Sequence, residues 1–116
     1  MATRNGSITL RKGNSETNEI YLDYPRLRKG VLLLRAVGHD LRKSIITLLK
    51  ENKSMTVTEL YQTLQLEQSV ASQHLAELRK AGVVKTVREG KHIHYSLNKD
   101  RIKAINTITK EISKEV

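Results

Sequence analysis

The chain has no cysteine, which excludes disulfide bonds, thiolate metal sites and thiol redox switches together. It also has no tryptophan and no phenylalanine, so four tyrosines supply all of its large aromatic side chains. A surface that stacks successive single-stranded bases on aromatic rings is therefore hard to build. The core has to consist mostly of leucine, isoleucine and valine.

Long apolar runs are absent as well. The longest, Val31 to Leu34, is far shorter than a helix that spans a bilayer. The N-terminus lacks the basic and then apolar pattern of a secretory signal. We therefore expect a cytoplasmic protein that has no membrane partner.

Negative charge is scarce relative to positive charge. Lysine and arginine total 21 against 12 aspartate and glutamate residues, which gives a formal net charge of +9 and a pI near 10.0. Such an excess is typical of proteins whose partner is rich in phosphate. The charge alone also fits a basic soluble domain without such a partner. At 116 residues the chain has room for one domain with one modest core.

Signals of catalysis are missing. No nucleophile and base, glycine-rich phosphate loop or pair of carboxylates occurs at a usable spacing, so we expect neither an enzyme nor a cofactor. His92 and His94 share one face of an expected strand, but a stable metal site usually needs three or four ligands. Glu89 is the one further candidate nearby, so we expect no metal site.

The first part of the chain is rich in glycine, serine and asparagine. We expect residues 1–23 to form a mobile arm, with some order near Ile20 to Leu22. A domain over residues 24–116 follows. Its first helix opens at Asp23-Tyr24-Pro25 and ends at Gly38. A second helix, with Asp40 as its N-cap, runs to about Glu51.

Two short helices, a hairpin and a last helix complete the expected domain. Thr56 and Glu59 have the spacing of a capping box, and a tight turn leads to a helix over about Gln68 to Ala81 that Gly82 ends. Strands follow over Val83 to Arg88 and His92 to Leu97, with a turn at Glu89-Gly90. The fold class is mainly α with a small β-hairpin, about five helices in the order α-α-α-α-β-β-α.

The first and last helices carry more apolar surface than one small core can cover. The first has Leu27, Val31 and Leu34 on one face, and the last has a stripe of isoleucines, Ile102, Ile105, Ile108 and Ile112, that ends at Val116. We expect this stripe to lie outside the core. A second subunit could cover both faces, and so could a different protein, in which case the chain is a protein-interaction module.

Two short helices joined by a tight turn, followed by a basic hairpin, have the order of a winged helix-turn-helix. From about Leu34 to Leu97 the chain resembles ArsR/SmtB-type bacterial transcriptional repressors. The resemblance rests on Val37-Gly38-His39-Asp40-Leu41-Arg42, on Thr58-Glu59-Leu60, on Ser69-x-x-Ser72-x-His74-Leu75-x-x-Leu78-x-x-Ala81-Gly82-Val83-Val84, and on Arg88-x-Gly90-Lys91 with Tyr95-x-Leu97.

The resemblance implies a homodimeric repressor that binds double-stranded DNA at a palindromic operator. The helix with the serine string would enter the major groove, with a reading face of Gln68, Ser69, Ser72, Gln73 and His74. The hairpin would contact the flanking DNA through Arg88, Lys91 and His92. Dimerisation would use the first and last helices, through Leu27, Val31, Leu34, Ile105, Ile108 and Ile112. Gln73 has the chemistry to pair with adenine, while His74 either contacts phosphate or packs against the neighbouring helix.

Other members of the family sense metals or redox state, and this chain lacks the residues that they use. The stretch that corresponds to their third-helix cysteines, Met55 to Glu59, has no thiol, and the last helix has no histidine. The effector is therefore not predicted. Nonspecific coating of DNA, suggested by the charge, is a further alternative to operator binding.

Overall fold

The structure, a computed structural model, describes residues 2–4, 7–11 and 19–114. The chain divides into two compact units, Met1–Leu33 and Leu34–Val116, which are described separately. Helix α1, at Tyr24–Gly38, contributes residues to both units. Among the described residues, no helix combines the length and the apolar character needed to cross a bilayer.

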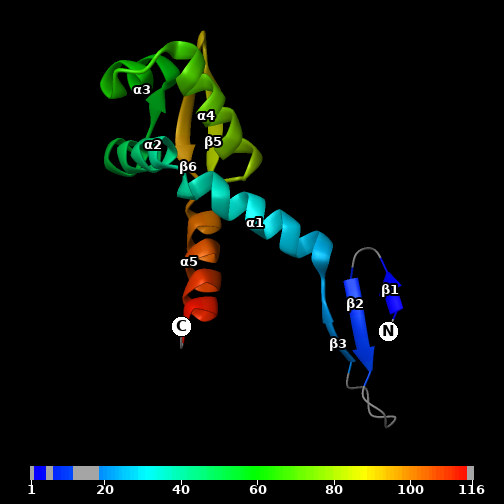
Figure 1. The fold of residues 1–116 in the computed structure, drawn as a ribbon. Helices are drawn as coiled ribbons and strands as arrows, with labels where there is room; N and C mark the ends of the chain where they lie inside the picture. Colours follow the sequence, from blue (N-terminus) through cyan, green and yellow to red (C-terminus); the bar gives the residue numbers. More distant parts are fainter. Residues whose placement is uncertain (1, 5–6, 12–18, 115–116) are drawn as a thin grey trace. The chain divides into compact units, whose positions relative to one another are not determined.

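The N-terminal unit contains a three-stranded antiparallel sheet in the order β1-β2-β3 (Figure 1). Its strands are β1 at Ala2–Arg4, β2 at Ser7–Arg11 and β3 at Glu19–Leu22, and the register pairs Ile8 with Leu22 and Leu10 with Ile20. The sequence predicts a mobile arm over residues 1–23, so β1 and β2 were missed. They are short, and only Ile8 to Leu10 shows any alternation. The arm's mobility stays a prediction.

Helix α1 begins where the sequence predicts. The Asp23 carboxylate accepts a hydrogen bond from the Arg26 backbone N–H at 3.2 Å, and Pro25 lies in the first turn, where a missing N–H costs nothing. In the described part of this helix, Ala36 alone is fully buried. Helix α1 therefore exposes most of the apolar residues that it carries.

The second unit is built on three helices, α2 at Asp40–Asn52, α3 at Val57–Leu64 and α4 at Gln68–Lys80. The expected N-cap of α2 is wrong by one residue. His39 is the cap, since its Nδ1 accepts from the Leu41 N–H at 3.2 Å, while Asp40 lies inside the helix and pairs with Lys43 at 3.6 Å. The capping box of α3 is confirmed, because Thr56 and Glu59 each accept a bond from the other's backbone N–H.

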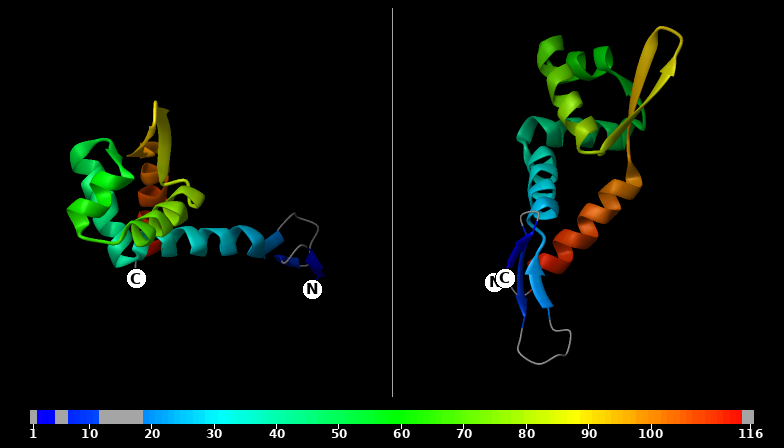
Figure 2. Two further views of the ribbon diagram at one scale, coloured as in Figure 1. Left: turned by 90° about the horizontal axis from the view of Figure 1, so that it is seen from above. Right: turned by 90° about the vertical axis from the view of Figure 1, so that its right-hand side faces the viewer.

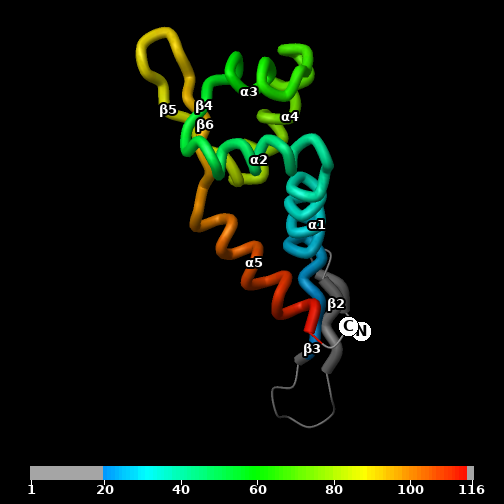
Figure 3. Tube along the Cα trace, turned by 90° about the vertical axis from the view of Figure 1, so that its left-hand side faces the viewer, coloured from blue at the N-terminus to red at the C-terminus, as the bar shows by residue number. Residues whose placement is uncertain are grey.

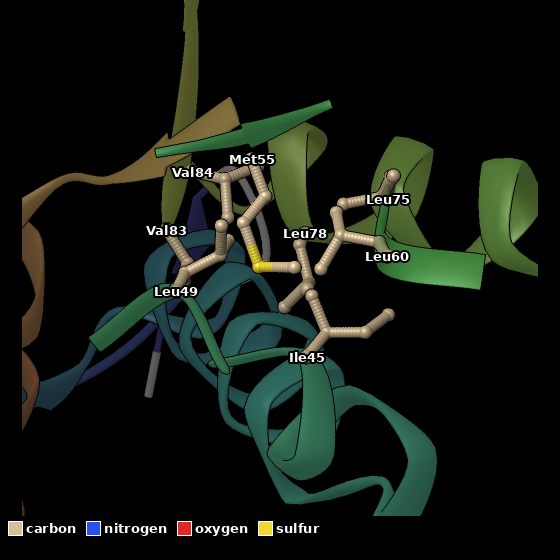
Figure 4. Close-up of a cluster of buried hydrophobic side chains, with 8 residues drawn as sticks. All are labelled: Ile45, Leu49, Met55, Leu60, Leu75, Leu78, Val83 and Val84. Carbon is tan, nitrogen blue, oxygen red and sulfur yellow. The ribbon is translucent and has the colours of Figure 1, made fainter. Parts of the chain in front are cut away.

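The core of this unit lies where α2, α3 and α4 meet the hairpin. Figure 4 shows eight buried side chains that converge there, Ile45, Leu49, Met55, Leu60, Leu75, Leu78, Val83 and Val84. None of them is more than 6% exposed. As the lack of large aromatics requires, the core is almost wholly aliphatic. Burying such side chains is the main source of stability for a domain of this kind.

Strands β5 at Val84–Glu89 and β6 at His92–Leu97 form the predicted hairpin, whose tip projects beyond the helices (Figure 2). The turn is one residue later than expected. Glu89 still pairs with His92, so Gly90 and Lys91 form the turn, and Gly90 takes the positive φ of 62° that its first position requires. A two-residue strand that the sequence did not predict, β4 at Met55–Thr56, pairs with the other side of β6.

Helix α5 at Lys99–Ser113 follows β6, and Figure 3 shows it leading away from the hairpin tip. Asn98 caps this helix, because its side-chain oxygen accepts from the Arg101 N–H at 3.3 Å, and its Nδ2 donates to the Gly82 carbonyl at 3.0 Å. Gly82 ends α4 with a φ of 74°, the left-handed conformation predicted for it. The isoleucine stripe is not wholly outside the core, because Ile102 and Ile105 pack against it.

Candidate nucleic-acid interface

Helix α4 has two contrasting faces. Ala71, Leu75 and Leu78 are completely buried in the core and fix the helix to the domain. The opposite face carries Ser69, Ser72 and Gln73, which the sequence assigns to DNA reading and which are exposed, and Gln68 is exposed as the first residue of the helix. The three-to-four-residue spacing of the buried positions dictates this separation. These four side chains can therefore reach a major groove without any rearrangement of the core.

Both ends of α4 are suited to a polyanion. The N-cap residue Glu67 makes no side-chain capping bond, so the first-turn N–H groups remain open to an acceptor such as a phosphate. Near the other end, Arg79 and Lys80 are exposed, and Lys80 lies 3.6 Å from Glu77. The exposed Ala76 lies between these cations and Gln73. Sequence reasoning used Arg79 and Lys80 only to balance the helix dipole and did not place them in the interface.

His74 differs from the other reading-face candidates because it is only partly exposed. Its Nδ1 accepts a hydrogen bond from Arg42 Nε at 3.2 Å, and its ring lies 4.8 Å from that of His39. Burial lowers the pKa of His74, and the nearby His39 and Arg42 lower it further. In the structure, His74 thus packs against α2, which is one of the two possibilities that the sequence left open.

The hairpin does not bring its three predicted contact residues to one side. Arg88, Lys91 and His92 are all exposed. However, Arg88 pairs with Ile93 and His92 with Glu89, and neighbouring pairs of an antiparallel ladder face opposite sides. The Arg88 Nε also donates to the Gly90 carbonyl at 3.3 Å, so this side chain folds over the turn. The ribbon therefore presents Arg88 on one face and His92 on the other, with Lys91 in the turn between the strands.

The apolar residues expected at a dimer interface fall into two groups. Leu27 and Val31 belong to the N-terminal unit, where both are exposed. In the second unit Leu34, Ile108 and Ile112 are exposed, whereas Ile105 is partly buried against the core. Ile112 has the highest exposure of any large apolar side chain described, at 68%. Five of the six predicted residues are thus uncovered in a single chain.

The described residues contain no group of three or more histidine, aspartate or glutamate side chains placed to hold a metal ion. At the hairpin, His94 Nε2 lies 3.9 Å from a Glu89 carboxylate oxygen, a pair rather than a ligand set. Sequence reasoning missed the grouping of His39 and Arg42 with His74. The only signal was the Gly38-His39-Asp40-Leu41-Arg42 stretch, whose closeness to α4 requires the fold.

The similarity to known proteins covers the helices and the strand described above. The family model described as bacterial regulatory protein, arsR family, matches residues 39–86, from the N-cap of α2 into β5. The transcriptional repressor PagR of Bacillus anthracis is 36% identical over 84 residues, which cover 72% of this chain and 84% of PagR. The transcriptional activator HlyU of Vibrio cholerae is 40% identical over 77 residues, which cover 66% of this chain and 70% of HlyU.

Solved structures of the same two proteins share the fold. The crystal structure of PagR matches with a TM-score of 0.60 at 35% identity, covering 74% of this chain and 98% of that chain. The structure of HlyU from Vibrio cholerae matches with a TM-score of 0.60 at 35% identity, covering 76% and 95%. Both relatives are named as transcription regulators and neither as an enzyme. The predicted winged helix-turn-helix fold is confirmed.

Proposed function

This chain belongs to the ArsR family of bacterial regulatory proteins and is a DNA-binding transcriptional regulator, and we propose that it is a homodimeric repressor of a palindromic operator. In this proposal α4 enters the major groove and the hairpin follows the flanking DNA. The protein works in the cytoplasm and has no enzymatic activity.

The observation that carries the proposal is the division of α4 into a buried and an exposed face. A solvated helix face needs no particular residues, but this one presents two glutamines and two serines. Its one acidic residue, Glu77, lies 3.6 Å from Lys80, and both Arg79 and Lys80 are exposed at its end. Glutamine can form a bidentate pair with adenine, and serine can donate to phosphate. We assign base reading to Gln73 and Gln68, phosphate contacts to Ser69 and Ser72, and flanking contacts to Arg88, Lys91 and His92.

Exposed apolar residues support the homodimer. Ile108 and Ile112 form a surface on α5 that the chain itself leaves uncovered, and contiguous exposed apolar surface usually marks an interface. A two-fold symmetric dimer would present two copies of α4 about 34 Å apart, one turn of DNA, or a multiple of that distance. That symmetry is the reason for proposing a palindromic operator.

The most detailed part of the proposal is that the protein represses transcription rather than activates it. PagR is named a transcriptional repressor and HlyU a transcriptional activator, so their names share transcriptional regulation but not its direction. We propose repression because a dimer that spans two half-sites excludes other proteins from the same DNA. Transcription of a template that carries the operator should fall as the protein is added, and a rise would make the chain an activator.

Selection of bound duplexes from a random pool tests the function most directly. The expected product is an inverted repeat whose half-sites are separated by about one helical turn, bound by two chains. A pool that stays random would instead support nonspecific coating of DNA.

The uncovered stripe on α5 also gives a reason to consider a protein-interaction module. In that case the chain alone would sediment as a monomer and leave Ile108 and Ile112 free for a different protein. Sedimentation at micromolar concentration separates the two functions before any DNA is added.

A further inference from the structure

Arg42 connects three helices of the second unit. It lies in the first turn of α2, and its Nε donates to Nδ1 of His74 in α4 at 3.2 Å. A second nitrogen of the same guanidinium, Nη1, donates to the carbonyl of the buried Ala36, in the last turn of α1, at 3.5 Å. One side chain of α2 thus connects α4 with the last turn of α1.

The hydrogen bond from Arg42 defines the protonation of His74. His74 Nδ1 accepts from Arg42 Nε, while the neighbouring His39 accepts from the Leu41 N–H through its own Nδ1. A ring nitrogen that accepts a hydrogen bond carries no proton, so the His74 ring is neutral, with its single proton on Nε2. The two ring centroids are 4.8 Å apart. Protonation of Nδ1 of His74 would remove the acceptor and place a cation beside Arg42.

The surroundings of His74 oppose that protonation. Burial, His39 and Arg42 lower its pKa, and Glu77, one turn further along α4, acts in the opposite direction. Helix α3 and strand β5 also contact α4, but among the described residues they contribute no charged group to the surroundings of His74. The neutral ring that accepts from Arg42 is therefore the stable form at neutral pH.

We propose that Arg42 is a positioning residue for DNA recognition, which holds α4 in one rotational setting through Nδ1 of His74. The inference rests on the proposed function of α4 as the reading helix. Contacts of Leu75 and Leu78 with the core set the depth of α4 but are non-directional, whereas a hydrogen bond constrains orientation. His74 directly follows Gln73, so restraining its ring restrains the direction of the reading side chain. His74 is then an anchor rather than a contact to DNA.

The test measures the ratio of dissociation constants for a random duplex and for the selected operator, at about pH 8 and at a pH below the titration midpoint that NMR finds for the His74 ring, at one ionic strength. The ratio cancels the nonspecific gain in affinity that any added positive charge brings. For the unsubstituted protein the ratio should fall roughly tenfold at the lower pH, the effect expected for one lost charge-assisted hydrogen bond.

Three variants separate positioning from other roles. Arg42→Met removes the donor and should give the low ratio at both pH values. His74→Gln offers an amide oxygen as an acceptor that does not titrate, and should keep the high ratio at both. His94→Gln removes a histidine of β6 outside the cluster and should keep the full pH response. Circular dichroism at both pH values checks that each variant is folded.

A second measurement needs no DNA. The Arg42 Nε–H resonance of the free protein should shift with the same midpoint as the His74 ring, and should not titrate in that range in His74→Gln. A ratio that stays high below the titration midpoint of His74 in the unsubstituted protein would overturn the inference. So would a His74→Gln variant that loses preference as Arg42→Met does, because His74 would then contact DNA directly. A missing operator preference at about pH 8 would instead overturn the proposed function, and the recognition role of Arg42 with it.

Discussion

Helices α4 and α5 look alike in sequence but differ in how the chain uses their apolar faces. They have 13 and 15 residues, and each carries an apolar stripe opposite polar and charged residues. In α4 the stripe is Ala71, Leu75 and Leu78, all completely buried, whereas α5 has no fully buried residue. Exposure rises along α5, from the partly buried Ile102 and Ile105 to Ile108 at 55%.

This comparison shows that the spacing of apolar residues in the sequence predicts an apolar helix face but does not predict which surface covers that face. The core of the second unit is completed by α2, α3, α4 and the first half of α5. The second half of α5 retains an apolar face for which the described chain offers no partner. Stability should therefore depend on the stripe of α4, and assembly on the end of α5. The predictions below test that division, starting with the largest effect.

Truncating the buried stripe should cost the most. Leu75→Ala removes a side chain with no exposed surface, and the cavity should lower the free energy of unfolding by about 2–5 kcal/mol. Ile112→Ala, measured at a concentration where the chain is monomeric, should lower it by less than about 0.5 kcal/mol. Urea unfolding followed by circular dichroism gives both values. Equal losses for the two variants would remove the distinction between the helices.

A charge on the exposed stripe should break assembly and leave the fold intact. Ile108→Asp would bury a carboxylate in the proposed interface, so the dissociation constant of the dimer should rise on the order of 100-fold. Thr107→Asp is the matched control, because the same charge on the opposite face of α5 should leave assembly unchanged. Sedimentation equilibrium measures both. Equal behaviour of the two variants would show that the stripe is not the contact surface.

Substitutions in α4 and in the hairpin should distinguish residues that read bases from residues that contact the DNA backbone. Gln73→Ala should lose about 1–3 kcal/mol of discrimination at one base pair in each half-site. Lys91→Ala should weaken binding to operator and random duplex alike, and should reduce the slope of log affinity against log salt by about 1 per phosphate contact. Gln62→Ala, at an exposed glutamine of α3, serves as the control. If Gln73→Ala and Lys91→Ala reduce both affinities by equal factors, the assigned roles are wrong.

The smallest effect is expected at the capping box of α3, the helix that packs beside α4. Thr56→Ala should lower the free energy of unfolding by about 1 kcal/mol through loss of the N-cap acceptor. Thr58→Ala, at an exposed threonine of the same turn that makes no cap, should have little effect.

The pH dependence of that loss has a defined sign. Hydrogen bonds from the Thr56 backbone and side chain lower the pKa of Glu59 below its ordinary value of 4.5. A carboxyl group whose pKa is lowered by folding stabilises the protein above its ordinary pKa, and this contribution is lost as the pH falls through 4.5 to the lower value of the folded state. The difference between Thr56→Ala and the unsubstituted protein should therefore shrink in acid. If the difference in unfolding free energy between the two proteins does not change with pH, the Glu59 carboxylate does not contribute to the cap.

Features that depend on neighbours along the chain were predictable from the sequence. The Thr56 and Glu59 box needs only a three-residue spacing, and the left-handed end of α4 needs only a glycine at position 82. The exposure of Gln73 follows from the helical period once Leu75 and Leu78 are placed inside. For the same reason five helices and the hairpin were identified in the correct order.

Features that depend on distant pairing were not predictable. Strand β4 exists because Met55 pairs with Tyr95, and two residues carry no pattern of their own. The contact between Arg42 and His74 joins residues 32 positions apart. At the hairpin, Arg88 pairs with Ile93 and His92 with Glu89, which puts Arg88 and His92 on opposite faces of the ribbon. Neither strand shows this separation by itself, because it depends on how the two strands pair.

The glycine that ends α4 also determines what a saturation library at residue 82 would recover. A methyl group there would lie 3.0 Å from the Arg101 guanidinium, which is the movable end of a flexible side chain, so crowding alone is cheap to relieve. The strain of a positive φ of 74° cannot be relieved in this way, because that angle disfavours every side chain that branches or fills space near the main chain. Asparagine tolerates such an angle best among the other amino acids, so it should rank directly after glycine among surviving clones, with valine and isoleucine absent.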